Sequence, residues 1–155
     1  MNRPELLGIY LNDHLAGSTG GVETARRARG SNEHTEFGEP LARVCEEIES
    51  DRESLEAVMD ELGIGRSRIK PAIGWLGEKL GRLKPNGQLR GYSPLSRVVE
   101  LELLIIGING KLRLWNVLDE LVGEESSADF KALIARAEAQ RSTVEDLQLR
   151  AAHLL

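Results

Sequence analysis

The sequence predicts an all-α protein, an up-and-down bundle of four long helices in which a long crossover joins the second helix to the third. Three observations support this prediction. Leu, Ile, Val and Ala dominate the apolar residues while aromatic residues make up only 4% of the chain, which favours helix-on-helix packing over sheets. Apolar residues recur at alternating spacings of three and four. Glycine and proline mark the ends of the segments that carry this pattern.

The first two helices are predicted over residues 3–29 and 40–62. Pro4 is tolerated in the first turn of the first helix. The second helix has the clearest apolar pattern in the chain, and Gly63 and Gly65 end it as C-capping residues. The positions of this apolar pattern are Leu41, Val44, Cys45, Ile48, Asp51, Leu55, Val58, Met59 and Leu62.

The crossover is predicted over residues 66–91 and contains a short helix over residues 71–83. The third long helix is predicted over residues 94–122. Ser93 is its expected N-cap, and Pro94 takes the first helical position, where its missing N–H group has no cost.

The fourth helix is predicted over residues 127–154, with Ser126 and Asp129 in capping-box positions. Its apolar pattern consists of Phe130, Leu133, Ala137, Val144, Leu147, Ala151 and Leu154. The 155 residues fit one domain, 1–155, of ordinary size.

Composition also bears on location and partners. A formal net charge of −5 argues against binding of the whole molecule to nucleic acid or to a membrane surface. The first residues lack the apolar core of a signal peptide, and the most apolar stretch, 103–108, is much shorter than the roughly 20 residues of a spanning helix. We therefore expect a cytoplasmic protein without a membrane segment, in which Cys45 is a small buried apolar residue.

Two groups of glycines fall inside predicted long helices, where each glycine costs about 1 kcal/mol relative to alanine. They are Gly17, Gly20 and Gly21 in the first helix, and Gly107 and Gly110 in the third. We interpret them as a site of close backbone approach between these two helices, with a kink of the first helix as the alternative. The glycine-rich stretch follows no predicted strand, so a phosphate-binding loop is not indicated.

Three stretches of the chain carry a family resemblance. They are residues 6–17 (LLGIYLNDHLAG), 47–55 (EIESDRESL) and 81–87 (GRLKPNG). Together they resemble an uncharacterised family of small bacterial ferritin-like proteins, and the resemblance extends over nearly the whole chain. It implies a ferritin-like bundle, in which two antiparallel helix pairs are joined by a long crossover.

The chain departs from the ligand pattern of ferritin-like di-iron proteins. Such proteins take a carboxylate from each of two helices and a Glu-x-x-His motif from each of the other two. Here no histidine occupies any of these ligand positions, and arginine stands at two of them. We therefore expect no metal and no cofactor. The corresponding pairs are Glu46 with Glu49, Glu49 with Arg52, Glu138 with Arg141, and Glu145 with Gln148.

Four polar residues fall on or beside the apolar faces and form a candidate axial cluster. Buried polar groups need partners, so we expect these side chains to meet in the bundle interior, with Arg52 or Tyr10 as donors. The favoured interpretation is a hydrogen-bonded cluster that fixes helix register; a small-molecule site and an acid–base site are the alternatives. The four residues are His14, Asp51, Glu102 and Asn109.

Charge is unevenly distributed along the chain. Residues 66–97 contain eight Lys or Arg and one acid, whereas residues 31–62 contain eleven acids and two arginines. The favoured interpretation is two solvated faces that partly compensate. The alternative is an anion-binding or partner-binding surface, and the scarcity of aromatic residues there argues against nucleic acid. This surface would consist of Arg66, Arg68, Lys70, Lys79, Arg82 and Lys84.

No catalytic motif is present, so the leading functional hypothesis is a non-enzymatic bundle that acts through protein–protein contacts, as a homodimer. Leu103 and Ile106 lie off the main apolar face of the third helix and need a cover, either the short crossover helix around Trp75 or a second subunit. One alternative is a ferritin-like metal-handling protein or oxidoreductase with an atypical site. The other is a small-ligand carrier with a polar axial pocket near His14, Asp51 and Glu102.

Overall fold

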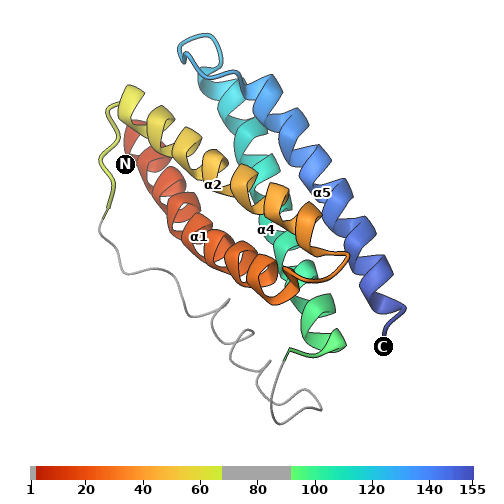
Figure 1. Ribbon diagram of the computed structural model, residues 1–155. Helices are drawn as coiled ribbons and strands as arrows, with labels where there is room; N and C mark the ends of the chain where they lie inside the picture. Colours follow the sequence, from red (N-terminus) through yellow and green to blue (C-terminus); the bar gives the residue numbers. More distant parts are fainter. Residues whose placement is uncertain (1–2, 68–91) are drawn as a thin grey trace.

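The computed structural model describes residues 3–67 and 92–155. Four α-helices make up this part of the chain, which contains no strand (Figure 1). They are α1 (Arg3–Asn32), α2 (Gly38–Glu61), α4 (Pro94–Val122) and α5 (Phe130–Ala152). The prediction of an all-α protein with four long helices is confirmed. The predicted short helix over 71–83 lies outside the described residues.

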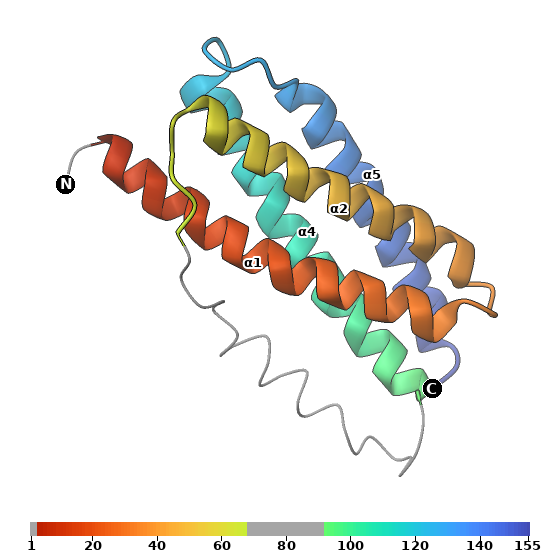
Figure 2. The same ribbon diagram turned by 60° about the vertical axis from the view of Figure 1, so that its left-hand side comes forward.

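The four helices form a bundle of two antiparallel pairs. α1 and α2 run in opposite directions, as do α4 and α5, whereas α2 and α4 run in the same direction (Figures 1 and 2). α1 packs against α2 and α4, and α5 packs against α4 and, over a smaller contact, against α2. Each helix is therefore antiparallel to both of its packing neighbours.

The turn between α1 and α2 is tighter than the sequence suggests. α1 continues to Asn32, whose side chain donates to the carbonyl of Ala28 at 2.7 Å, and α2 begins already at Gly38. A Cβ atom at Gly38 would lie 2.7 Å from the carbonyl oxygens of Asn32 and Glu33. Glycine is therefore required at this point by the closeness of the preceding chain.

Capping residues set the first residue of both helices in the second pair. Ser93 caps α4 by accepting from the backbone N–H of Ser96 at 3.1 Å, and Pro94 is the first helical residue, as predicted. α5 starts at Phe130, three residues later than predicted, because Asp129 is its N-cap and accepts from the N–H of Ala132 at 2.9 Å. Ser126 belongs to the preceding loop.

A layer of polar side chains divides the core into two apolar clusters. Asp51, Lys111 and Gln140 lie in this layer, between the apolar turns of α2, α4 and α5. One cluster includes Val22, Ala25, Ala28, Phe37, Leu41, Val44, Cys45, Ile48, Leu101, Leu104, Ile108, Val144, Leu147 and Ala151. The other includes Leu11, Leu15, Leu55, Val58, Met59, Leu112, Leu114, Trp115, Leu118, Val122, Phe130, Leu133 and Ala137.

The interpretation of the helix glycines as close contacts is wrong at Gly17, Gly21, Gly107 and Gly110. A Cβ atom added at Gly17, Gly21, Gly107 or Gly110 would meet no atom within 4 Å. α1 is continuous from residue 3 to residue 32. The missing side chains leave space between α1 and α4 instead of bringing the two backbones together.

Leu103 and Ile106, which lie off the main apolar face of α4, differ in their exposure to solvent. Leu103 is buried, whereas Ile106 exposes 41% of its surface. Leu103 is therefore covered within the chain, whereas the expectation that Ile106 needs a cover, from the crossover or from a second subunit, stays a prediction. Across residues 3–67 and 92–155, no helix combines the length and the apolar character that crossing a membrane requires.

The glycines allow a paired test of stability. Gly110→Ala should raise the free energy of unfolding by about 0.5–1 kcal/mol, because it removes the helix-interior cost of glycine without a clash. Gly38→Ala should lower it, because the new methyl group would meet two backbone oxygens. Urea unfolding followed by circular dichroism measures both, and a destabilising Gly110→Ala would mean that α1 and α4 are closer than the structure shows.

Candidate functional site

A buried carboxylate forms the centre of the polar layer. Asp51 exposes 1% of its surface and forms ion pairs with Lys111 of α4 and Arg136 of α5. Arg136 Nε donates to Asp51 Oδ1 at 2.8 Å, and Gln140 Nε2 donates to Oδ2 at 3.0 Å. The prediction that Asp51 is buried and paired is confirmed. Its donors come from α4 and α5; of the expected donors, Arg52 donates to Ser18 and Thr19 instead, and the ring of Tyr10 contacts that of His14.

Lys111 is the buried cation of this layer. Its Nζ donates to Asp51 and, at 2.5 Å, to Gln140 Oε1. Burial lowers the pKa of Lys111, and Asp51 opposes this shift; Arg136 lowers the pKa further, with an effect larger than the opposing effect of Glu47. Sequence analysis missed both Lys111 and Gln140, although each lies three or four residues from apolar positions of its helix.

A cavity of about 490 Å³ lies beside this layer, between α1, α2 and α4. Its rim is formed by the exposed residues Asp13, Gly17, Ile106 and Gly107. Buried apolar side chains dominate its floor, and Asp51, Arg52 and Lys111 border it on the side of the polar layer. The apolar residues that line it are Ile48, Leu55, Leu103, Leu104, Ile106, Ile108, Leu114 and Trp115.

Glycines produce much of this cavity. Gly17 and Gly21 line it from α1, and Gly107 and Gly110 line it from α4. These are the four positions at which a Cβ atom would meet nothing within 4 Å. Side chains at these positions would occupy the space. The glycines therefore keep the cavity open, although each of them lowers the stability of its helix.

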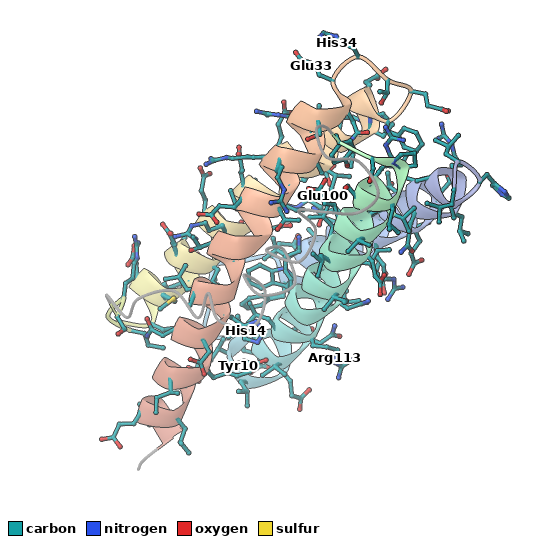
Figure 3. The ribbon with its side chains drawn as sticks, turned by 90° about the horizontal axis from the view of Figure 1, so that it is seen from below. Tyr10, His14, Glu33, His34, Glu100 and Arg113 are labelled. Carbon is teal, nitrogen blue, oxygen red and sulfur yellow. The ribbon has the colours of Figure 1, made fainter. Side chains whose placement is uncertain are left out.

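Two aromatic groups in the cavity wall carry polar atoms. The rings of Tyr10 and His14 meet edge to face at a centroid distance of 4.6 Å, and they lie next to each other between α1 and α4 (Figure 3). Burial lowers the pKa of His14, with a smaller opposing effect of Asp13. His14 is therefore neutral at pH 7, and its ring offers one donor and one acceptor.

Trp115, which lines the cavity, carries a buried donor without a partner in the described part of the chain. Its side chain is fully buried, and its Nε1 has no hydrogen-bond partner among the described residues. An indole N–H is a donor only and is normally paired when buried. An unpaired buried donor costs about 1–3 kcal/mol, and the residue that carries it is one of those that line the cavity.

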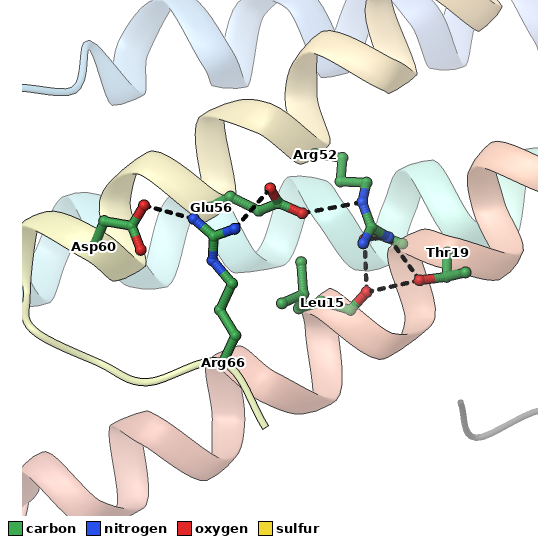
Figure 4. Close-up of polar contacts among 7 residues, drawn as sticks. Leu15, Thr19, Arg52, Glu56, Asp60 and Arg66 are labelled. Atoms are coloured by element: carbon green, nitrogen blue, oxygen red, sulfur yellow. Dashed lines mark hydrogen bonds and ion pairs between the residues drawn. The ribbon is translucent and has the colours of Figure 1, made fainter. Parts of the chain in front are cut away.

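Arg52 is held at the edge of the cavity by α1. Its Nη1 donates to Thr19 Oγ1 at 2.6 Å and to Ser18 Oγ at 3.2 Å, and its Nε lies 3.2 Å from Glu56 Oε1 (Figure 4). These contacts fix the guanidinium group between α1 and α2. The residue is thus a fixed part of the cavity wall, with its charge balanced by Glu56.

The predicted axial cluster is wrong for two of its four members. Asp51 and His14 both line the cavity. Glu102 is exposed, and Asn109 is half-buried and accepts from Arg141 Nη1 at 3.4 Å. Glu102 and Asn109 are seven residues apart and so share a face of α4, which is turned away from the cavity.

The predicted basic surface is described at one position only. Arg66 is exposed and pairs with Asp60 at 2.5 Å and with Glu56 at 3.2 Å (Figure 4). Its charge is therefore compensated by acids at the end of α2, in agreement with the interpretation of compensating faces. The other five residues, Arg68, Lys70, Lys79, Arg82 and Lys84, lie outside the described residues.

A second buried polar group lies between α1 and the start of α4. Glu100 is 3% exposed and pairs with Arg27 at 2.5 Å, while its Oε2 atom has no partner in the described part of the chain (Figure 3). Asn32 accepts from Arg97 Nε at 2.6 Å and donates to the hydroxyl of Tyr92 at 3.1 Å. None of these residues lines the cavity. Their contacts join α1 to the start of α4 at one end of the bundle.

Metal ligands are not brought together in the regions that the structure describes. No group of three or more His, Cys, Asp or Glu side chains there is placed to hold a metal ion. His34 lies exposed in the turn after α1, and His153 is exposed just after α5. The cavity is therefore the feature of the described bundle that is best suited to bind a molecule.

The ion cluster gives a prediction for stability. Asp51→Asn should lower the free energy of unfolding by about 3–5 kcal/mol, because it leaves the buried Lys111 ammonium without its counter-charge. The double variant Asp51→Leu with Lys111→Met should recover most of this loss, since Arg136 is 31% exposed and can turn to solvent. Urea unfolding of the single and double variants checks both, and a cost below about 1 kcal/mol for Asp51→Asn would contradict a structural role.

Comparison of the chain with protein-family models, with curated proteins and with solved structures returned no significant match.

Proposed function

We propose that the protein binds a small, largely apolar molecule in the cavity between α1 and α4. The observation that carries this proposal is an open cavity whose floor contains a buried indole N–H without a partner. A volume of about 490 Å³ falls within the range of about 300–1,000 Å³ that is usual for small-molecule sites. An apolar lining with few polar groups is likewise typical of such sites.

The lining defines the kind of ligand. Leu104, Ile108 and Leu114 offer a hydrocarbon surface, and Trp115 adds a flat aromatic wall. A molecule with an apolar body would bury its surface against them, with about 25 cal/mol gained for each Å² removed from water. One acceptor atom on the ligand would satisfy the indole N–H. The glycines of both helices support this proposal. They destabilise their helices, and no close contact at these positions requires a glycine.

A ferritin-like origin of the bundle is part of the same proposal. Two antiparallel helix pairs with α2 parallel to α4 (Figure 1) is the order expected when a long crossover joins the pairs. Di-iron bundles gather carboxylates around metal ions at the bundle axis. Here one carboxylate, Asp51, meets the cations Lys111 and Arg136. This supports a bundle that binds an organic ligand without a metal.

Binding can be tested with decan-1-ol as a neutral apolar probe. The full chain should bind it saturably, with one site per chain, in displacement of the fluorescent dye N-phenyl-1-naphthylamine. Gly110→Leu should abolish binding without loss of stability, because the new side chain occupies cavity space where no atom lies within 4 Å of the Cβ position.

The matched control is Gly30→Leu, which places the same side chain at an exposed glycine of α1 outside the cavity. It should leave binding unchanged. Trp115→Phe should weaken binding of decan-1-ol about two- to tenfold, through loss of one hydrogen bond. Equal binding by wild type and Gly110→Leu would place the probe elsewhere and refute the cavity as the site.

Self-association through α4 is the second candidate, and it would make the protein act through protein–protein contacts. Leu95 and Ile106 of α4 expose 40% and 41% of their surfaces, which favours a second copy as their cover. Sedimentation velocity at micromolar concentration should then detect a twofold dimer that Ile106→Glu dissociates. A single species of 17.1 kDa would end this proposal.

A further inference from the structure

The charges of the polar layer do not balance, and the imbalance lies next to the cavity. One carboxylate, Asp51, is shared by two cations, Lys111 and Arg136, and the fourth member, Gln140, is neutral. A further acid, Glu47, also acts on the pKa of Lys111, with an effect weaker than that of Arg136. The cluster therefore has two positive charges and one negative charge, and because Arg136 is 31% exposed, the cost of burial falls mainly on the Lys111 ammonium.

Lys111 is the member of this cluster that combines a positive charge with access to the cavity. It lines the cavity and keeps 15% of its side chain exposed. An ammonium group has three N–H donors, and two of them are used by Asp51 and Gln140. One donor remains. Trp115, whose indole N–H has no partner among the described residues, lies one helical turn further on the same face of α4 and lines the same cavity.

We propose that the natural ligand of this cavity is an apolar carboxylate, whose carboxylate group pairs with the Lys111 ammonium while its hydrocarbon part lies on the apolar floor. This inference rests on the proposed function and specifies its ligand class. The anion supplies the negative charge that the polar layer lacks, and a charge-assisted hydrogen bond is stronger than a neutral one. The indole N–H of Trp115 offers a second donor to the same head group.

The pairing couples binding to protonation. Burial and Arg136 lower the pKa of Lys111 in the free protein, and a bound carboxylate would raise it again. In the pH range between the lowered pKa of Lys111 in the free protein and its higher pKa in the complex, binding of the anion therefore takes up a proton from solvent. The carboxylate, the neutral amine and one proton combine into an ion pair, with no other bond made or broken.

Other charged and titratable groups face Lys111 or its cavity. They come from every neighbouring helix: Tyr10, Asp13 and His14 from α1, Glu47, Asp51 and Arg52 from α2, and Arg136 from α5. Burial lowers the pKa of His14 from its ordinary 6.5 and raises that of Tyr10 from its ordinary 10.0. Neither group therefore changes its charge appreciably between pH 7.5 and pH 9, the range in which the coupling is to be measured.

The experiment compares two probes of equal chain length, decanoate and decan-1-ol, by isothermal titration calorimetry with the full chain. At pH 7.5 decanoate should bind about tenfold or more tightly than decan-1-ol. Titrations in buffers of different ionisation enthalpy should show proton uptake with decanoate that increases from pH 7.5 to pH 9. Decan-1-ol should show none.

Variants assign the effect to one side chain. Lys111→Met should remove the preference for decanoate and the proton uptake while decan-1-ol still binds; Lys111→Arg should keep the preference without the proton uptake. Lys131→Met, at an exposed position of α5 outside the cavity, is the matched control and should behave as wild type. If Lys111→Met does not fold, the proton uptake of the wild type remains the deciding measurement.

The outcomes separate the two proposals. Binding of decan-1-ol as tight as that of decanoate, without proton uptake, overturns the carboxylate inference and leaves the cavity as a binding site. A preference for decanoate that persists in Lys111→Met overturns the role of Lys111. Absence of binding by either probe contradicts the proposed function itself, and the inference falls with it.

Discussion

The buried carboxylate of Asp51 is the interaction on which the arrangement of the two helix pairs depends. α2 and α5 pack over a small contact, and Asp51 bridges this region by reaching Lys111 on α4 and Arg136 on α5. Such a cluster is weak evidence for a large stabilisation, because the desolvation of three charges offsets most of their attraction. It is stronger evidence for specificity, since only one register of the helices satisfies all of its members.

The cavity follows from the same layer. Leucine side chains in place of the glycines would fill the space between α1 and α4. No ligand could then enter beside Trp115. The chain accepts a cost of about 1 kcal/mol at each helix-interior glycine and a further cost for the unpaired indole. Features that weaken a fold without a packing reason are expected at functional sites, and here several of them lie around a single space.

Sequence reasoning located the helices well because their signal is local. The spacing of Leu41, Val44 and Ile48 and the Ser93–Pro94 cap depend only on neighbouring residues. Asp51 could be placed in the interior for the same reason, as a polar residue at an apolar position. Its partners could be suspected only from the gap between Ala137 and Val144, which Gln140 fills, and from Lys111, three residues after Ile108.

The glycine pattern predicts the wrong arrangement because two opposite arrangements share one sequence signal. A row of glycines on facing helices permits close approach, and it equally permits an opening; the distance between the helices decides, and it depends on side chains elsewhere, such as Leu103 and Trp115. Glu102 and Asn109 were misplaced for a related reason. α4 is apolar over most of its circumference, so its pattern does not identify which face points to the bundle axis.

The division of the core by a polar layer also has a consequence for how the protein opens. Two apolar clusters separated by a polar layer need not lose their structure together, and such units open locally with separate free energies. The chain carries a natural reporter in each. Cys45, fully buried in one cluster, becomes reactive to thiol reagents only when that half opens, and the fluorescence of Trp115 follows the other half. The cooperativity between the halves is therefore a measure of how firmly the charged layer joins them.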